Sequence, residues 1–144
     1  MLDIRAIPAQ EVPQHWEELC PFIEMALAES LGELIADDVL SRAKAGLLHL
    51  VRIAVDGHAI ACLAVEFAEY PRKRALRVTL AGGSQLEIWF DAAEKYLIQG
   101  ARNMGCQLLE MHGRPGWWKL LRRNKGVVRS IIMLREVPAE ETAP

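Results

Sequence analysis

The chain has 144 residues, with 17 Lys and Arg, 19 Asp and Glu, and 51% hydrophobic residues. This length fits one domain whose core needs no disulfide or metal to hold it. No apolar run reaches the roughly 20 residues of a membrane-spanning helix, and the start MLDIRAIPAQ lacks the pattern of a secretory signal. The three cysteines are far apart and lack CxxC spacing, which argues against a disulfide frame or a zinc site and favours a reducing compartment.

Charge is distributed unevenly along the sequence. Residues 1–71 hold 4 basic and 12 acidic residues, whereas residues 72–144 hold 13 basic and 7 acidic residues. Such basic segments are either an ordinary solvated surface or a binding surface for an anionic ligand or an acidic partner. No nucleic-acid-binding motif accompanies them, so nucleic acid is a weaker candidate. Ten of these 13 basic residues fall in two clusters: Arg72, Lys73, Arg74 and Arg77, then Arg114, Lys119, Arg122, Arg123, Lys125 and Arg129.

The first third of the chain predicts one strand and two helices. Residues 2–7 alternate as in a short strand. Residues 13–27 place apolar side chains at steps of three and four, as in a helix, with a kink or a break expected at Pro21. A second helix is predicted from Glu33 to Ala45.

The middle of the chain predicts a hairpin followed by a third strand. Residues 47–55 and 58–70 are β-prone and flank Asp56-Gly57, a pair that suits a tight turn with positive φ at both positions. After the PRKR loop, residues 75–81 read as a strand. These segments indicate an antiparallel sheet.

The next segment is the clearest helix. Ser84 and Glu87 have the spacing of a capping box, and Gly105 suits the left-handed residue that ends a helix. Between them runs an apolar stripe in which Trp89 and Tyr96 are expected to lie in the core. Strand 106–112, a short basic helix ending near Gly126 and strand 127–137 complete the prediction.

The predicted order is β-α-α-β-β-β-α-β-α-β. It indicates an α/β (α+β) domain over residues 1–137 and a polar tail over residues 138–144. The sheet should be mixed, mostly antiparallel and twisted, with about six strands and flanking helices. Residues 75–112 should form its parallel crossover.

This order resembles the GNAT superfamily of acyl-CoA-dependent N-acyltransferases over nearly the whole chain. The pieces A-R-x-x-G-C, from Ala101 to Cys106, and G-R-x-G-W, from Gly113 to Trp117, are similar to a GNAT-like group encoded by tailed bacteriophages. Further residues that carry this likeness are Trp16, Pro21, Tyr70, Pro71 and Trp89.

The resemblance implies a coenzyme A site in the turn between the third strand of the middle segment and the long helix. There the family holds the pyrophosphate on backbone amides and a helix N-terminus. Here the candidate cofactor-binding residues are Gly82, Gly83 and Ser84, without the family's arginine or its G-x-G spacing. They form either a degenerate anion site or a tight turn with a helix cap, and we favour the turn.

The resemblance also supplies a check on catalysis. The position of the family's proton-donating tyrosine corresponds to Arg122, and an arginine does not donate a proton near neutral pH. Candidate general bases are Glu66 and His112, with Glu69 and Glu110 beside them on the same strands. Each is more often a surface or core residue than a catalytic one.

We therefore predict a GNAT-fold protein with a degenerate acyl-CoA site, acting as a non-catalytic structural or interaction component of an assembly such as a bacteriophage particle. Its partners would be other proteins or further copies of itself, in the host-cell cytoplasm or in the virion, with no cofactor, metal or membrane. The alternative is an active N-acyltransferase that uses acetyl-CoA and an amine acceptor. The candidate interaction residues follow the strand at 106–112 and include adjacent tryptophans: Arg114, Trp117, Trp118, Lys119, Arg122 and Arg123.

Overall fold

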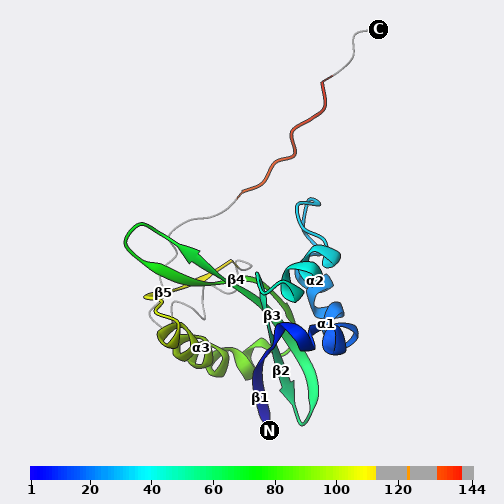
Figure 1. The fold of residues 1–144 in the computed structure, drawn as a ribbon. Helices are drawn as coiled ribbons and strands as arrows, with labels where there is room; N and C mark the ends of the chain where they lie inside the picture. The colour runs from blue at the N-terminus through cyan, green and yellow to red at the C-terminus, as the bar shows by residue number, and fades with distance from the viewer. Residues whose placement is uncertain (113–122, 124–132, 141–144) are drawn as a thin grey trace.

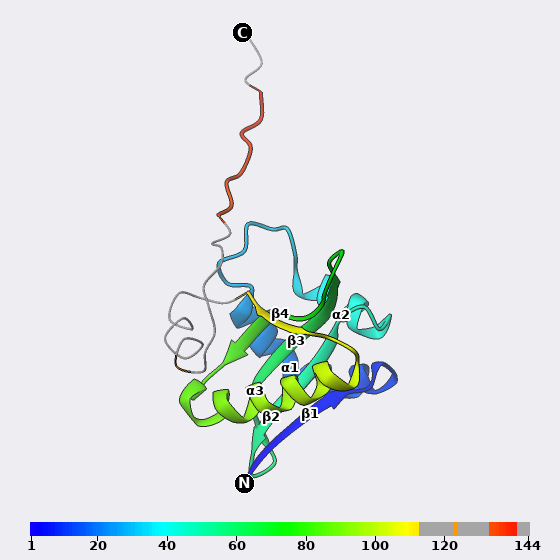
Figure 2. The ribbon, with the colours of Figure 1, turned by 90° about the vertical axis from the view of Figure 1, so that its left-hand side faces the viewer.

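The computed structural model describes residues 1–112, 123 and 133–140. In this part of the chain, a five-stranded sheet is covered by helices on both faces (Figures 1 and 2). The elements in chain order are β1 (Leu2–Ile7), a 3-10 turn (Ala9–Glu11), α1 (Val12–Ala26), α2 (Ala36–Lys44), β2 (His49–Val55), β3 (His58–Glu69), β4 (Arg74–Gly83), α3 (Leu86–Asn103) and β5 (Leu108–Met111).

The strands lie side by side in chain order, β1-β2-β3-β4-β5. The first four are antiparallel, and β5 joins β4 in parallel after α3. This arrangement confirms the predicted mixed, mostly antiparallel sheet and its parallel crossover. The turn between β2 and β3 is also as predicted, since Asp56 and Gly57 have φ values of 49° and 85°.

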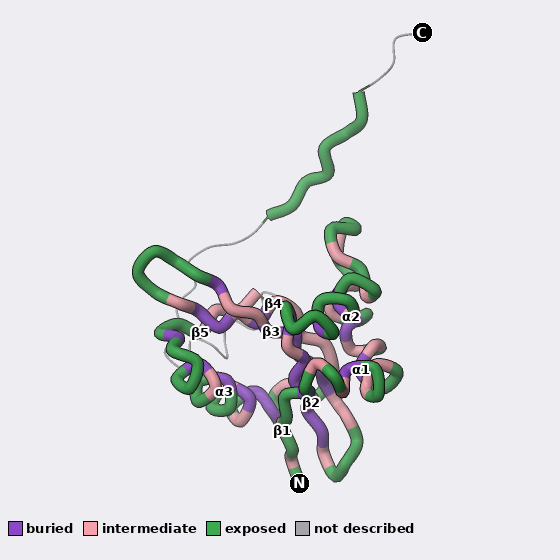
Figure 3. Tube along the Cα trace, in the orientation of Figure 1, coloured by how far each residue is buried: buried purple, intermediate pink, exposed green. Residues whose placement is uncertain are grey.

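The last predicted strand is not formed where it can be seen. Residues 133–137 have no regular structure and are exposed (Figure 3), and no strand of the described part of the chain pairs with them. Residues 127–132 and nearly all of the predicted basic helix lie outside the described residues, although Arg123 is helical. The described sheet therefore has one strand fewer than expected.

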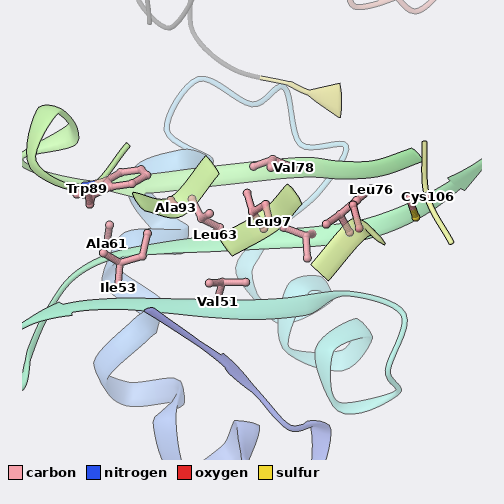
Figure 4. Packing of buried hydrophobic residues seen from close by; sticks show 12 residues of the cluster. Val51, Ile53, Ala61, Leu63, Leu76, Val78, Trp89, Ala93, Leu97 and Cys106 are labelled. Atoms are coloured by element: carbon pink, nitrogen blue, oxygen red, sulfur yellow. The ribbon is translucent and has the colours of Figure 1, made fainter. Parts of the chain in front are cut away.

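One core lies between the sheet and α3. Trp89, Ala93 and Leu97 of α3 pack on the central strands (Figure 4), and the Trp89 indole Nε1 donates to the Ser84 carbonyl at 2.9 Å. Tyr96 was also expected in this core, and that expectation is wrong. Its residue is 38% exposed, and its hydroxyl accepts a hydrogen bond from the Ala6 amide of β1 at 3.0 Å.

A second core lies between the opposite face and the helices α1 and α2. Leu19 and Ile23 of α1 are completely buried in it. Helix α1 continues through Pro21, so the break expected there does not occur. Pro21 cannot donate to the Glu17 carbonyl, but both residues are exposed, so water can bond to that carbonyl instead. Helix α2 begins three residues later than predicted, since Glu33 instead accepts the Leu31 amide in the preceding loop at 2.7 Å.

The two ends of α3 differ in how well the sequence predicted them. At its C-terminus, Gly105 has a φ of 73° and Cys106 donates to the Ala101 carbonyl at 2.8 Å, which confirms the left-handed cap. At its N-terminus, the capping box is wrong. The cap residue is Gln85 in a left-handed conformation, with no side-chain hydrogen bond, because β4 continues through Gly83 and leaves Ser84 outside the helix.

Candidate functional site

The structure brings the two predicted bases, Glu66 and His112, into one group of polar side chains. Its centre is Arg77, which lies directly opposite Glu66 on β3 and Glu110 on β5. Strand alternation places Glu66 on the face that carries α1 and α2, together with the buried Cys62 and Ala64. We call the following residues the Arg77 cluster: Glu66, Tyr70, Arg77, Thr79, Glu110 and His112.

Arg77 links the three strands through ion pairs. Its Nε donates to Glu110 Oε1 at 2.7 Å, and its Nη1 lies 3.5 Å from Glu66 Oε1. These side chains are 24% to 27% exposed, so water weakens the pairs only in part. The cluster therefore ties β4 to both of its neighbours.

A bulge in β4 shapes the cluster on one side. Ala64 pairs with Leu80 and Val65 pairs with Val78, which leaves Thr79 as an extra residue. The Thr79 hydroxyl donates to Glu66 Oε2 at 2.8 Å. Next to the bulge, the His112 amide donates to the Val78 carbonyl at 2.9 Å, immediately after the last residue of β5. The cluster thus lies where the strand pairing changes.

Glu110 accepts hydrogen bonds from three side chains. Tyr70 donates to its Oε2 at 2.5 Å, while Arg77 and His112 meet its Oε1 at 2.7 Å and 2.8 Å. Partial burial alone would raise the pKa of Glu110, but the bonds from Tyr70, Arg77 and His112 outweigh it and hold the pKa below its ordinary value. Glu110 is therefore a carboxylate at neutral pH and does not serve as a proton donor.

His112 has the surroundings of an oriented base. A carboxylate only accepts hydrogen bonds, so His112 Nε2 carries a hydrogen toward Glu110, and Nδ1 is left as the acceptor nitrogen of the neutral ring. The His112 side chain is 33% exposed. A histidine held in this way can take a proton from a bound molecule, which is the chemistry expected of it from the sequence.

The turn in which the resemblance implies a pyrophosphate site makes close contacts within the protein. A Cβ at Gly82 would lie 1.8 Å from the Phe22 carbonyl oxygen of α1. A Cβ at Gly83, whose φ is +141°, would lie 2.4 Å from the Ile60 carbonyl oxygen of β3. Both glycines are therefore required by packing against the protein itself, without reference to a ligand.

Two further groups of this turn bear on whether an anion can bind there. The Ser84 amide donates to the Ile60 carbonyl at 3.0 Å, so it is not free for an anion. Glu87 lies in the first turn of α3, where its carboxylate interacts favourably with the positive end of the helix dipole. Gly82, Gly83 and Ser84 are thus engaged in contacts within the protein.

Several of the predicted basic residues are already paired. Arg74 contacts Glu69 at 2.5 Å, donates to the Met104 carbonyl at 2.6 Å and stacks over the Phe67 ring at 4.2 Å. Arg123 lies 3.3 Å from Asp91 of α3. The other predicted interaction residues lie outside the described part of the chain: Arg114, Trp117, Trp118, Lys119 and Arg122.

Two further properties concern only the described residues. Within them, no group of three or more His, Cys, Asp or Glu side chains could hold a metal ion. Over the same ranges, no helix has the length and apolar character needed to cross a membrane.

Sequence reasoning did not identify the parts played by Tyr70, Arg77 and Thr79. Glu66 and Arg77 stand at equal distances from the hairpin loop, so the loop position could have paired them. No comparable signal marks Thr79, because the bulge that exposes it has no local sequence signature.

Comparisons with known proteins show which fold this is. No protein-family model and no curated protein matches the sequence. Among solved structures, an aminoglycoside acetyltransferase, meta-AAC0020, from an uncultured soil metagenomic sample has a TM-score of 0.68 and 9% identity, with 96% of this chain and 97% of that one covered. Ribosomal-protein-alanine N-acetyltransferase from Brucella melitensis biovar Abortus 2308 has a TM-score of 0.67 and 14% identity, with 95% and 100% covered.

A third similar structure is the aminoglycoside N-acetyltransferase AAC(6')-Iy in complex with CoA. It has a TM-score of 0.62 and 13% identity, with 94% of this chain and 95% of that one covered. Identities this low establish the fold alone. The chain has the GNAT fold of the N-acetyltransferases.

Proposed function

We propose that this GNAT-fold chain is a non-catalytic structural or interaction component of a protein assembly, such as a bacteriophage particle. The observation that supports this proposal is the packing of Gly82 and Gly83 against the backbones of α1 and β3. Together with the engaged Ser84 amide, this packing supports a turn that serves the protein's own structure and not the pyrophosphate of an acyl-CoA. The fold then provides a rigid surface, which is one of the many uses a fold can have.

The bacteriophage setting rests on the likeness of the A-R-x-x-G-C and G-R-x-G-W pieces to phage-encoded proteins. In this proposal the segment from Arg114 to Arg123, with its tryptophans and arginines, contacts protein partners. The protein would act in the host-cell cytoplasm or in the virion.

A second candidate function is acyl transfer to an amine, and the His112–Glu110 pair favours it. The pair would let His112 Nδ1 take the proton from an amine acceptor, with Glu110 fixing the ring. The structural neighbour solved in complex with CoA makes acetyl-CoA the donor to test. We place this function second because the packing of Gly82 and Gly83 supports the non-catalytic proposal.

Isothermal titration of the purified full chain with acetyl-CoA and with CoA separates the two functions. The first proposal predicts no binding even at millimolar ligand, whereas micromolar binding would overturn it. Placing an anion in the turn, as in Gly83→Asp, is unsuitable as a test of coenzyme binding because a side chain at this position collides with β3. His112→Ala is better suited: under the second function it should abolish acetyl transfer to an amine while leaving the binding heat unchanged.

A further inference from the structure

β1 is an edge strand whose outer side is largely unpaired. The Asp56 amide donates to the Met1 carbonyl, so the odd-numbered residues of β1 direct their backbone groups toward β2. The backbone groups of Leu2, Ile4 and Ala6 therefore point away from the sheet. Only the Ala6 amide has a partner there, the Tyr96 hydroxyl at 3.0 Å, within the described part of the chain.

The side chains beside this free edge carry opposite charges that form no salt bridge within the described residues. Asp3 and Arg5 precede and follow Ile4 in the sequence and are both exposed. Their side chains lie on the sheet face that carries α1, opposite to that of Ile4. Neither forms a salt bridge with any described residue. The nearest polar group to Arg5 is His15, 3.4 Å away and not an anion.

Arg5 is also placed opposite a like charge. Across the β1–β2 pair it faces Arg52, and Glu18 neutralises Arg52 at 2.6 Å rather than Arg5. Like charges directly opposite each other destabilise a strand pair. A carboxylate from outside the chain would relieve this arrangement, and a chain paired along the free edge can supply one.

We propose that β1 pairs antiparallel with β1 of a second copy of this chain, about a two-fold axis at Ile4. In that register Ile4 exchanges both backbone hydrogen bonds with Ile4 of the second copy. Asp3 then lies opposite Arg5 of the second copy, and Arg5 opposite Asp3, so both charge pairs form twice by symmetry. The two sheets are then joined through the Ile4 pair, because the outward Ala6 amide already donates to the Tyr96 hydroxyl.

The packing of β1 on the α3 core favours this edge of the sheet as the pairing surface. Leu2 and Ile4 are half-buried against the α3 core, so the strand is held in place before it pairs. The opposite edge, β5, is followed directly by residues outside the described part of the chain. Because the paired segment is short, we expect a dimer that dissociates on dilution.

The β1 edge would be the surface through which copies of this chain associate, which rests on the proposed function as a component of an assembly. Its test measures oligomer size and not coenzyme binding, so the two proposals can fail separately. Sedimentation velocity of the full chain over a wide range of concentration should show a monomer–dimer equilibrium. A monomer at every concentration would overturn the inference.

Charge reversal gives the sharper test. Asp3→Arg or Arg5→Asp alone places like charges opposite each other and should weaken dimerisation by about tenfold or more. The double variant Asp3→Arg/Arg5→Asp restores opposite charges and should dimerise again. The two single variants, mixed, should form a heterodimer. Dimerisation that is insensitive to the single reversals, or a double variant weaker than both, would contradict the register.

A backbone variant tests the strand pairing independently of charge. Ile4→Pro removes the outward amide while leaving the bonds to β2 intact, so it should abolish the dimer. Its fold is checked by circular dichroism, and the charge variants decide the question if Ile4→Pro does not fold. Glu17→Lys, on the exposed side of α1, is the matched control and should leave the dimer unchanged.

Discussion

Gly82 of β4 and Phe22 of α1 approach each other so closely that the residue at position 82 can have no side chain. An added Cβ would lie 1.8 Å from the Phe22 carbonyl oxygen, which belongs to backbone and cannot rotate away. This contact fixes how α1 lies on the sheet. It also gives a packing reason for Gly82, a residue that the family resemblance implies for coenzyme binding.

The contact predicts a large difference between two glycine variants. Gly82→Ala should lower the free energy of unfolding by about 3 kcal/mol, because α1 must move to admit the methyl group. Gly100→Ala is the control: it lies inside α3 with nothing within 4 Å of its added Cβ and should stabilise by about 0.5–1 kcal/mol. Urea unfolding measures both, and equal effects would contradict the packing.

The Arg77 cluster predicts that removing its cation costs more than removing an exposed one. Arg77→Met leaves Glu66 and Glu110 half-buried without their shared partner, and the free energy of unfolding should fall by about 2 kcal/mol. The matched variant Arg72→Met, in the exposed hairpin loop, should change it by less than about 0.5 kcal/mol. The idea fails if both variants unfold at the same urea concentration.

Glu110 predicts a specific loss of stability in acid. Its pKa is lower in the folded protein than in the unfolded chain, so its contribution is complete above the ordinary Glu pKa of about 4.3 and is lost as the pH falls through the folded pKa. Below about pH 4.5, unfolding free energy should therefore fall more steeply in the wild type than in Glu110→Gln. The tail variant Glu140→Gln should follow the wild type. Parallel curves for the wild type and Glu110→Gln would refute this role.

The fold could be predicted to a large extent because its signals are local. Asp56, Gly57 and Gly105 have positive φ values. Few residue types adopt this conformation readily, so their presence in the sequence marks the turn and the helix end. The start of α3 was predicted wrongly because a contact between residues far apart in the sequence overrides the local pattern there. Ser84 and Glu87 have the right spacing for a cap, but the pairing of Gly83 with Ala61 extends β4 and displaces that cap.

The candidate site could be predicted only in part because it depends on strand register. Glu66 and His112 were identified by residue type alone. What joins them is the alignment of Arg77 with Glu110 across a parallel pair, and no local pattern determines that alignment. Burial and hydrogen bonding of Glu110 follow from it, so they too required the structure.

The strand order also bears on how the protein is made. Each strand of the sheet lies next to the strand that precedes it in the chain. Among the described strands, a polypeptide emerging from the ribosome can therefore add one strand after another, each beside the strand synthesised before it. Such sequential growth favours hairpin pairings between nearby segments and leaves the parallel pairing of β4 with β5 as the latest step among the described strands.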